Sequence, residues 1–525
     1  MPWSLASKGA NFSMNLLRTL ATVSSLTMVS RVLGYVRDFL IARIFGAGLM
    51  TDAFFVAFKI PNLLRRLFAE GAFSQAFVPI LAETKNRTGV EETKALIDAI
   101  ATVLFLVLVV AAALGMAAAP IIVYLTAPGF ASEPEKYAIT VQLLRITFPY
   151  IVFISLVSLS AGILNTWNRF SVPAITPALL NVAFIVGALF FAERFDPPVL
   201  VLAWAVFVGG ALQLACQVPF LARLGLLPRW RFDLSHPGLR RVLLLMVPAA
   251  FGVSVSQVSL LLNQIFASFL PTGSVSWLYY ADRLMELPAG VLGVAVGTIL
   301  LPSLSKYHAS ANTAEYSRLL DWGLRITVLL AVPSAVALAV IALPLVTMLF
   351  QYGRFGAEDA LMTRQALIAY SVGLVGMILV KILAPGFYAR QNIATPVKIG
   401  IVTLVATQLM NLGLVGPLRH AGLALAIGLG ACLNALLLYF NLRRQGIYAP
   451  QPGWLVFVLK VLASVSLMAI VLFTTMGESA WWLQAEGHLK VPAVLGLVAL
   501  GAAVYGACLF AFGFRPRDFS RRAAD

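Results

Sequence analysis

The sequence predicts an all-α polytopic membrane protein with about fourteen transmembrane helices. Hydrophobic residues make up 60% of the 525 residues and charged residues only 11%, whereas a soluble chain carries about a quarter charged residues. The apolar residues form long blocks, such as 101–124 and 491–512, and each block can cross a hydrocarbon core of about 30 Å as a helix. Membrane β-barrel strands would instead give short segments of alternating hydrophobicity.

Turn residues between the apolar blocks set the approximate limits of each helix, and the first two predicted helices carry many charges. Residues 1–13 differ in character from the rest, and Met14 is an alternative start, so we expect a disordered N-terminal extension over 1–13. The predicted helices span residues 16–45, 52–82, 95–126, 138–167, 174–193, 198–222, 239–269, 275–306, 317–350, 361–389, 396–415, 421–443, 454–475 and 490–513.

Cations are distributed unevenly between the two sets of predicted loops. By the positive-inside rule, the cation-rich side is cytoplasmic, and both termini then lie there. We therefore expect a multi-pass protein of the bacterial inner membrane with a basic cytoplasmic tail over 514–525. The loop cations on the N-terminal side are Lys85, Arg87, Lys94, Arg169, Arg223, Arg229, Arg231, Arg240, Arg241, Lys306, Arg318, Arg390, Arg443 and Arg444. The opposite loops hold mostly single cations, namely Arg43, Lys136, Arg194, Arg354, Arg419 and Lys490.

A faint internal repeat divides most of the chain into two copies of six helices. Three residue pairs share a separation of 223 residues: Pro79 and Pro302, Pro173 and Pro396, and Ala161 and Ala384. Six helices per copy give both copies the same orientation, which is a parallel repeat. We predict an N-terminal bundle over 14–222, a C-terminal bundle over 239–443 and an appended helix pair over 454–513. Two such bundles are typical of transporters, and a duplicated scaffold is the alternative.

Several other classes of protein fit the composition poorly. The net charge is +16, but the basic residues lie between the apolar blocks and do not form a patch interleaved with aromatic residues. No nucleic-acid partner is therefore expected. The cysteines lie within apolar segments, and the histidines do not stand at metal-ligand spacing, so we expect no metal and no cofactor. These residues are Cys216, Cys432, Cys508, His236, His308, His420 and His488.

Charged residues within the predicted helices are the strongest functional signal. A charge at the centre of a membrane helix costs about 2.5–3.5 kcal/mol, so such side chains must face water, one another or a ligand. Arg18 and Arg43 are expected to reach the interface instead. The first helix carries Arg31, Arg37 and Asp38, the second carries Asp52, Lys59, Arg65, Arg66 and Glu70, and the eighth carries Asp282, Arg283 and Glu286.

Helical spacing predicts that several of these residues line a common cavity. Arg31 and Asp38 are seven residues apart and share a face of the first helix. On the eighth helix, Ser276, Tyr280 and Arg283 share a face. Lys381 in the tenth helix is a further candidate for a cavity or coupling residue. A continuous polar stripe on the second helix comprises Lys59, Asn62, Arg66 and Glu70.

The arginines among these charges predict the sign of the ligand. Arginine binds phosphate and carboxylate groups in a planar, bidentate manner, so the cavity favours an anionic substrate such as a pyrophosphate. An exporter of cationic drugs would need an acidic or aromatic cavity. The acids are expected to orient arginines or to act as gates, and these pairing candidates are Asp38, Asp52, Asp282 and Glu286, with Lys59 and Glu70.

Long runs of residues, which cover most of the chain from Met14 onward, are similar to those of one family. The chain resembles the MurJ (MviN) family of lipid II flippases, within the multidrug/oligosaccharidyl-lipid/polysaccharide exporter superfamily. The matching runs include Ser30-Arg31-Val32-Leu33-Gly34, Thr51-Asp52-Ala53-Phe54, Pro61-Asn62-Leu63-Leu64-Arg65-Arg66, Trp277-Leu278-Tyr279-Tyr280-Ala281-Asp282-Arg283 and Pro385-Gly386-Phe387-Tyr388-Ala389-Arg390.

The resemblance implies transport of lipid II, the undecaprenyl-pyrophosphate-linked precursor of peptidoglycan. It implies that helices thirteen and fourteen shape a groove for the lipid tail. Some members bind sodium through an acidic residue on helix seven, but Asn263 is the strongly polar residue near that position here, so sodium is not expected to carry over unchanged. The family's essential cavity charges correspond to Arg31, Arg37, Asp52, Arg65 and Arg283, and its cavity serines to Ser30 and Ser276.

Together these features predict alternating access driven by the membrane potential or an ion gradient. The expected partners are lipid II, membrane phospholipids and the peptidoglycan-synthesis machinery. A flippase for another polyprenyl-linked glycan and a multidrug antiporter of the same superfamily are the alternative transporters. A membrane enzyme acting on polyprenyl pyrophosphate is the alternative from another class, and it would need a convergent acid–base or metal constellation, which the sequence does not show.

Overall fold

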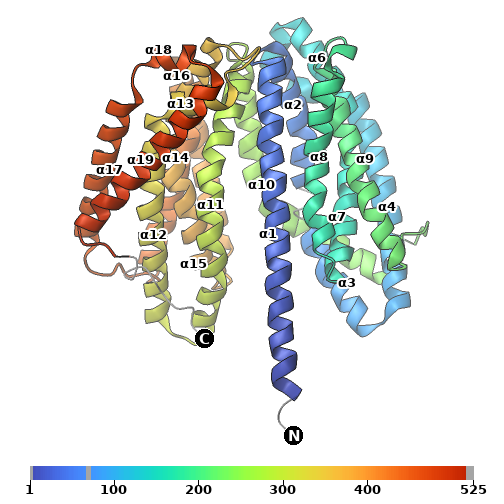
Figure 1. The fold of residues 1–525 in the computed structure, drawn as a ribbon. Coiled ribbons are helices and arrows are strands. Elements are labelled where there is room, and N and C mark those ends of the chain that lie inside the picture. Colours follow the sequence, from blue (N-terminus) through green and yellow to red (C-terminus); the bar gives the residue numbers. More distant parts are fainter. Residues whose placement is uncertain (1–3, 67–72, 234, 516–525) are drawn as a thin grey trace. The chain divides into compact units, whose positions relative to one another are not determined.

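The computed structural model describes residues 4–66, 73–233 and 235–515, and within these ranges the chain is helical and contains no strand (Figure 1). The first half comprises α1 (Ser4–Phe45), α2 (Leu49–Leu64), α3 (Ser74–Arg87), α4 (Val90–Ala117), α5 (Ala119–Thr126), α6 (Pro134–Thr147), α7 (Tyr150–Thr166), α8 (Ser171–Phe190) and α9 (Leu200–Arg223). The second half comprises α10 (Pro237–Ser268), α11 (Ser274–Ala309), α12 (Thr313–Val340), α13 (Ala342–Phe350), α14 (Ala357–Leu383), α15 (Pro385–Tyr388), α16 (Ala394–Arg444), α17 (Trp454–Met476), α18 (Ser479–Gln484) and α19 (Gly487–Ala511). Short 3₁₀ turns lie at Pro128–Ser132 and Ala192–Arg194.

The chain forms two compact units, and the boundary between them falls within α10, between Leu261 and Leu262. The sequence placed this boundary earlier, between residues 222 and 239. The start of α10 belongs to the first unit because Leu239 and Val242 are buried in a core cluster with Leu96 of α4. The short turn Gly46–Gly48 groups with the second unit.

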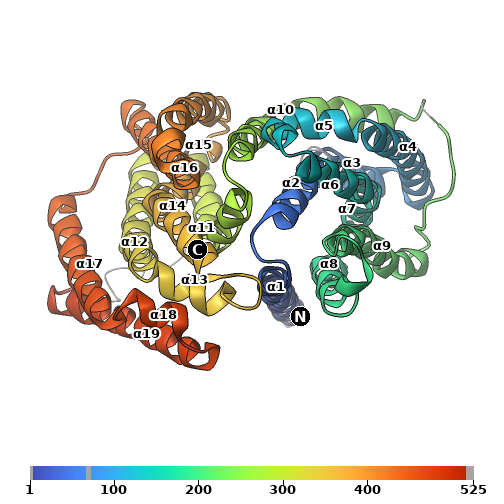
Figure 2. The same ribbon diagram turned by 90° about the horizontal axis from the view of Figure 1, so that it is seen from above.

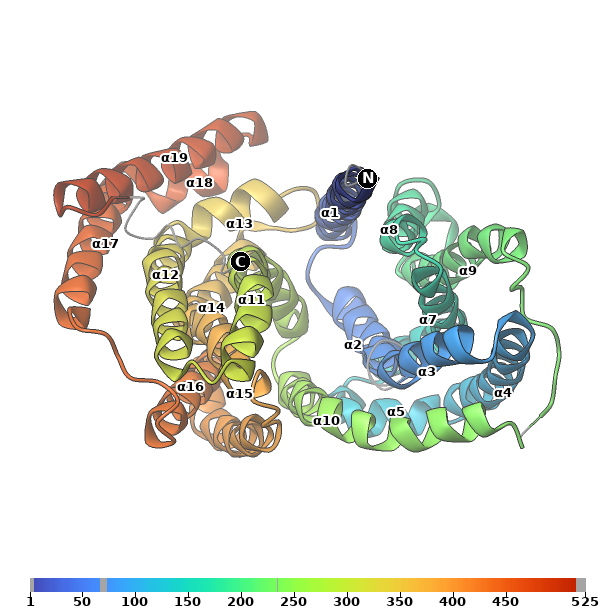
Figure 3. The same cartoon turned by 90° about the horizontal axis from the view of Figure 1, so that it is seen from below.

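In the first unit, α1 packs along α8, which in turn packs along α9 (Figures 1 and 3). The helix α7 lies against α9, and α2 lies against α6. A core of aromatic and aliphatic side chains, including Phe77, Ile97 and Ile163, joins α3, α4 and α7. This packing holds the charged helices α1 and α2 on a rigid frame.

In the second unit, α14 is the central helix and contacts α11, α12 and α16. Gly373 of α14 faces Gly428 of α16 so closely that a Cβ added to Gly373 would lie 2.1 Å from the Cα of Gly428. Small residues at such crossings let membrane helices approach. The appended helices α17 and α19 pack on each other and against α12 and α13 respectively (Figure 2).

Most predicted helices are present, several of them divided or joined. The predicted helix over 52–82 corresponds to α2 and α3, and the one over 317–350 corresponds to α12 and α13, which meet at Ile341. The predicted pair 396–415 and 421–443 forms the continuous α16, which kinks at Arg419, where φ is 50° and ψ is −130°. Nine helices or joined segments among the described residues are long and apolar enough to span a membrane, so the number fourteen stays a prediction.

The N-terminal segment and the internal repeat are two further features that the sequence predicts. The expected disorder of residues 1–13 stays a prediction; in the structure α1 begins at Ser4. The internal repeat stays a prediction, although Pro173 and Pro396 each stand two residues after the first residue of their helices, Ser171 of α8 and Ala394 of α16.

Candidate functional site

Arg37 is the most firmly held of the predicted substrate-binding arginines in the first unit. Its Nε and Nη2 atoms donate to Oδ1 of the neighbouring Asp38, at 2.9 and 2.7 Å. Its Nη1 donates to Oδ1 of Asn181 on α8 at 3.0 Å, and its guanidinium lies 5.4 Å from the ring centroid of Phe184. The carboxylate is 2% exposed and the arginine side chain 12% exposed. The guanidinium is therefore fixed by groups on two helices.

The other predicted residues of α1 lie in different surroundings. The Ser30 carbonyl accepts a hydrogen bond from Nδ2 of Asn181 at 3.0 Å, so one amide side chain contacts both Ser30 and Arg37. Arg31 is exposed, whereas Asp38 is buried. Although the two share a face by spacing, seven residues separate them by about 10 Å along the helix, so their burial differs.

Asp52, predicted to bind substrate or orient an arginine, is buried near the start of α2. Its Oδ2 lies 3.2 Å from Nζ of Lys136 on α6, and both side chains are 1% exposed. The ammonium also lies 3.6 Å from the carboxylate of Glu133 and 4.3 Å from the ring centroid of Phe130. The charged partner of Asp52 in this contact is thus a lysine, and the sequence had assigned Lys136 to a loop.

The end of α2 departs from the predicted continuous stripe. The α-helix ends at Leu64, and residues 65–66 are π-helical. Arg65, three residues after Asn62, contacts this residue of the stripe: its Nε and Nη2 donate to Oδ1 of Asn62 at 2.9 and 2.7 Å. Arg66 is exposed and Lys59 is half-buried. Glu70 lies outside the described residues.

On α11 of the second unit, the predicted polar face is only partly accessible. Ser276 and Tyr280 are fully buried, and the Tyr280 ring packs against Phe350 with centroids 4.9 Å apart. Arg283 is 33% exposed and donates to Oε2 of Glu286 at 2.8 Å, and its guanidinium lies 4.9 Å from the ring centroid of Tyr279. Asp282 is half-buried. Cation–π contact and an ion pair orient this guanidinium.

Two further polar residues of the second unit make contacts between helices. Lys381 of α14 donates to the carbonyl of Ala289 on α11 at 2.9 Å. Asn263 on α10 accepts a hydrogen bond from Nδ2 of Asn411 on α16 at 2.8 Å, and the same Nδ2 lies 3.1 Å from Oε1 of Gln408. The position of Asn263, where some family members have an acidic sodium ligand, thus holds a cluster of neutral amides.

Sequence reasoning did not find Asn181 or Lys136. Asn181 is a lone asparagine in the apolar run of α8, and nothing nearby marks it as a partner for Arg37. Lys136 stands just before a predicted helix, and only the packing of α6 on α2 brings it to Asp52. An amide or ammonium side chain within or beside a predicted membrane helix is the sequence signal that could have pointed to Asn181 and Lys136. The substrate contacts assigned to the predicted residues stay predictions.

Comparisons with known proteins agree on one family. The family model described as lipid II flippase MurJ matches residues 41–486. The chain is 53% identical over 515 residues to the lipid II flippase MurJ of Burkholderia cenocepacia, covering 97% of this chain and 100% of that protein. It is 41% identical over 503 residues to the probable lipid II flippase MurJ of Haemophilus influenzae, covering 93% and 98% of the two chains.

Solved structures show the same relationship. A lipid II flippase MurJ in an inward closed conformation superposes with a TM-score of 0.80 at 27% identity, covering 95% of this chain and 99% of that one. A multidrug transporter of the MATE family, within the MOP superfamily, shares the fold with a TM-score of 0.65 at 14% identity, covering 81% and 98%. The matched relatives are named as flippases and not as enzymes. The chain therefore belongs to the lipid II flippase MurJ family and is a membrane transporter.

Proposed function

We propose that the chain carries lipid II from the cytoplasmic to the periplasmic leaflet of the bacterial inner membrane by alternating access. Family membership and 53% identity to a named lipid II flippase make the chain a lipid II flippase, and lipid II supplies peptidoglycan synthesis. The direction, the cytoplasmic location of both termini and contact with the peptidoglycan-synthesis machinery are parts of this proposal. The loop cations support the orientation through the positive-inside rule.

The observation that best supports a mechanism is the restraint on Arg37. An arginine in a membrane helix is costly, and here Asp38, Asn181 and Phe184 hold its guanidinium in one orientation. Groups that are already oriented lose little entropy when a ligand binds. A pyrophosphate presents oxygens that match guanidinium geometry, and its charge would compensate that of the arginines.

In the proposed cycle, Arg31, Arg37, Arg65 and Arg283 bind the pyrophosphate and the polar headgroup, while the polyprenyl chain stays in the hydrocarbon region. Neutralisation of these guanidinium groups then favours the state that opens to the other leaflet. Lipid II can drive this change only by the difference between its affinities for the two states. The membrane potential or an ion gradient supplies the remaining free energy, at about 2.3 kcal/mol per charge per 100 mV.

Appearance of lipid II in the outer leaflet tests this function. Cells depleted of the protein should accumulate lipid II that an externally added lipid II-cleaving enzyme cannot reach, and wild-type protein should restore cleavage. Immunoblotting of the membrane fraction is the control that shows that the restored protein has inserted. Unchanged cleavage after depletion would reject the assignment. Competition between lipid II and other polyprenyl-linked glycans separates this function from that of a flippase for another glycan, and competition by cationic drugs would instead indicate a multidrug antiporter.

A further inference from the structure

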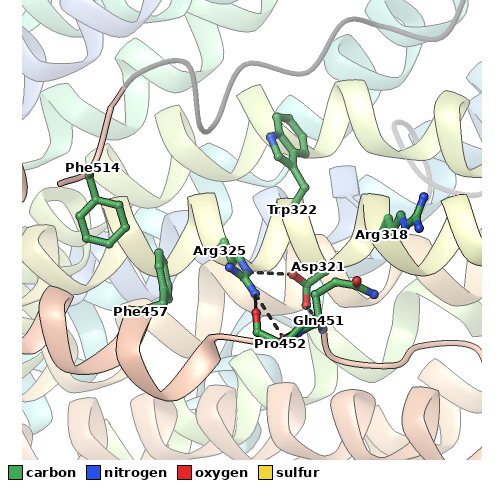
Figure 4. Close-up of a pocket in the computed structure, with 8 residues that line it drawn as sticks. All are labelled: Arg318, Asp321, Trp322, Arg325, Gln451, Pro452, Phe457 and Phe514. Atoms are coloured by element: carbon green, nitrogen blue, oxygen red, sulfur yellow. Dashed lines mark hydrogen bonds and ion pairs between the residues drawn. The ribbon is translucent and has the colours of Figure 1, made fainter.

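The second unit contains a pocket of about 430 Å³ near the start of α12, away from α11 and its Arg283. One wall is α12, another is the segment that joins α16 to α17, and a third is the chain that follows α19 (Figure 4). The lining residues are Arg318, Asp321, Trp322, Arg325, Gln451, Pro452, Phe457 and Phe514.

The floor of the pocket is rigid because one buried carboxylate joins its walls. Asp321 Oδ1 accepts hydrogen bonds from the Tyr448 hydroxyl at 2.7 Å, the Trp454 indole at 2.7 Å and the Gln451 backbone N–H at 3.0 Å. Asp321 Oδ2 accepts from Nε of Arg325 at 2.8 Å. These bonds fix the segment between α16 and α17 against α12, so the pocket is a built feature of the fold.

Positive charge exceeds negative charge around this floor. Arg325 Nη2 donates to the Pro452 carbonyl at 2.8 Å, which holds the guanidinium in the pocket wall. Arg318 is 59% exposed in an ion pair with Glu315. Lys460 Nζ lies 5.5 Å from the ring centroid of Phe514, at the aromatic side of the pocket. The acids among these neighbours are Asp321 and Glu315, so an anion is favoured.

The pocket also lies beside surface suited to hydrocarbon. The arginines of α12 precede its apolar run over 326–340, which places them at the end of the membrane-spanning stretch. The neighbouring α17 exposes Leu455 at 74%, Val456 at 55% and Leu459 at 57%. Inside the pocket, Phe457 and Phe514 lie on one side of Arg325 (Figure 4). A phosphate group at the arginines would therefore have its attached chains beside the aromatic side of the pocket.

We propose that this pocket binds the phosphate group of an anionic phospholipid of the surrounding leaflet. A free phosphate ion would share the arginine contacts, whereas a lipid would also place its attached chains against the aromatic side of the pocket, Phe457 and Phe514, which favours a lipid. This site does not depend on the transport arginines. A lipid bound in the pocket would contact both α12 and the appended pair, α17 and α19.

Native mass spectrometry of the full-length protein, exchanged into mixed vesicles of phosphatidylglycerol and phosphatidylethanolamine, tests this site. We expect preferential retention of phosphatidylglycerol. Arg318→Gln and Lys460→Gln should each weaken that retention about fivefold, because one surface cation near an anionic lipid contributes about 1 kcal/mol. Arg87→Gln is the matched control, since Arg87 is 76% exposed and pairs with Glu83 within one helix as Arg318 pairs with Glu315.

Three outcomes would overturn the proposal. Equal retention of the two phospholipids would show that charge does not select the ligand. An equal loss in Arg87→Gln and Arg318→Gln would indicate a general effect of surface charge. If inorganic phosphate at a concentration equal to that of the lipid displaced phosphatidylglycerol, the ligand would be a free phosphate and the lipid assignment would fail. Thermal unfolding of each variant, expected to match wild type, confirms that the comparison concerns folded protein.

Discussion

Asn181 Oδ1 accepts a hydrogen bond from Nη1 of Arg37 at 3.0 Å, and the two residues are 144 positions apart in the chain. The same amide donates to the Ser30 carbonyl at 3.0 Å. Asn181 is 8% exposed, so water cannot readily replace these contacts. A residue that the sequence left unremarked thus positions an arginine that the sequence singled out.

Replacing Asn181 should impair transport without unfolding the protein. In Asn181→Ala and Asn181→Leu, Arg37 keeps Asp38 and the Phe184 ring but loses its hydrogen bond to α8, so we expect lipid II transport to fall about tenfold, which corresponds to about 1.4 kcal/mol. Transport by reconstituted protein measures this. Asn441→Ala is the control, because the Asn441 amide bonds only locally, to the Leu437 carbonyl, among the contacts described. Equal effects of the two alanine substitutions would contradict the positioning role.

Asp52 and Lys136 should show strong mutual dependence. Removing one partner leaves the other charge buried, which costs about 3–5 kcal/mol, whereas removing both charges costs less. Asp52→Asn and Lys136→Met should each lower the apparent melting temperature more than the double variant does. A double-mutant cycle by thermal unfolding in detergent checks this coupling. Additive losses would show that the ion pair is not a unit of stability.

The close crossing of α14 and α16 predicts a steric effect. Gly373→Ala would place a methyl group against the Gly428 backbone, and overpacking of this kind costs about 1–3 kcal/mol. Gly496→Ala on α19 is the matched control, since no atom lies within 4 Å of its added Cβ. Thermal unfolding should therefore show a lower melting temperature for the first variant and no loss for the second. Equal melting temperatures would mean that the helices do not cross this closely.

The contacts of Tyr448 predict that the protein loses stability at alkaline pH. Burial raises the pKa of its hydroxyl, and the adjacent Asp321 carboxylate raises that pKa further. A pKa raised by folding gives stability that is fully present below the ordinary tyrosine pKa of about 10 and is lost as pH rises above it. Tyr448→Phe should be less stable than wild type at pH 8, and the difference should shrink toward pH 11. A difference that stayed constant over this range would contradict this role.

The sequence was most informative about the helices and least informative about side-chain partners. Apolar blocks locate most helices because hydrocarbon tolerates only helices or closed barrels. Helical spacing predicted a stripe of Lys59, Asn62, Arg66 and Glu70 on the second helix, and the structure shows that Asn62 also contacts Arg65, three residues away. Spacing within one helix carries no information about Lys136 or Asn181, whose contacts depend on packing between helices.

The central claim is that the predicted arginines bind lipid II. The most direct measurement is the affinity of the purified protein for lipid II in lipid nanodiscs, compared among Arg31→Ala, Arg37→Ala, Arg283→Ala and the control Arg43→Ala. We predict that each of the first three weakens binding at least about tenfold, because each removes a contact to the anionic headgroup, and that the control binds as wild type. Wild-type affinity in Arg31→Ala and Arg283→Ala would contradict the claim.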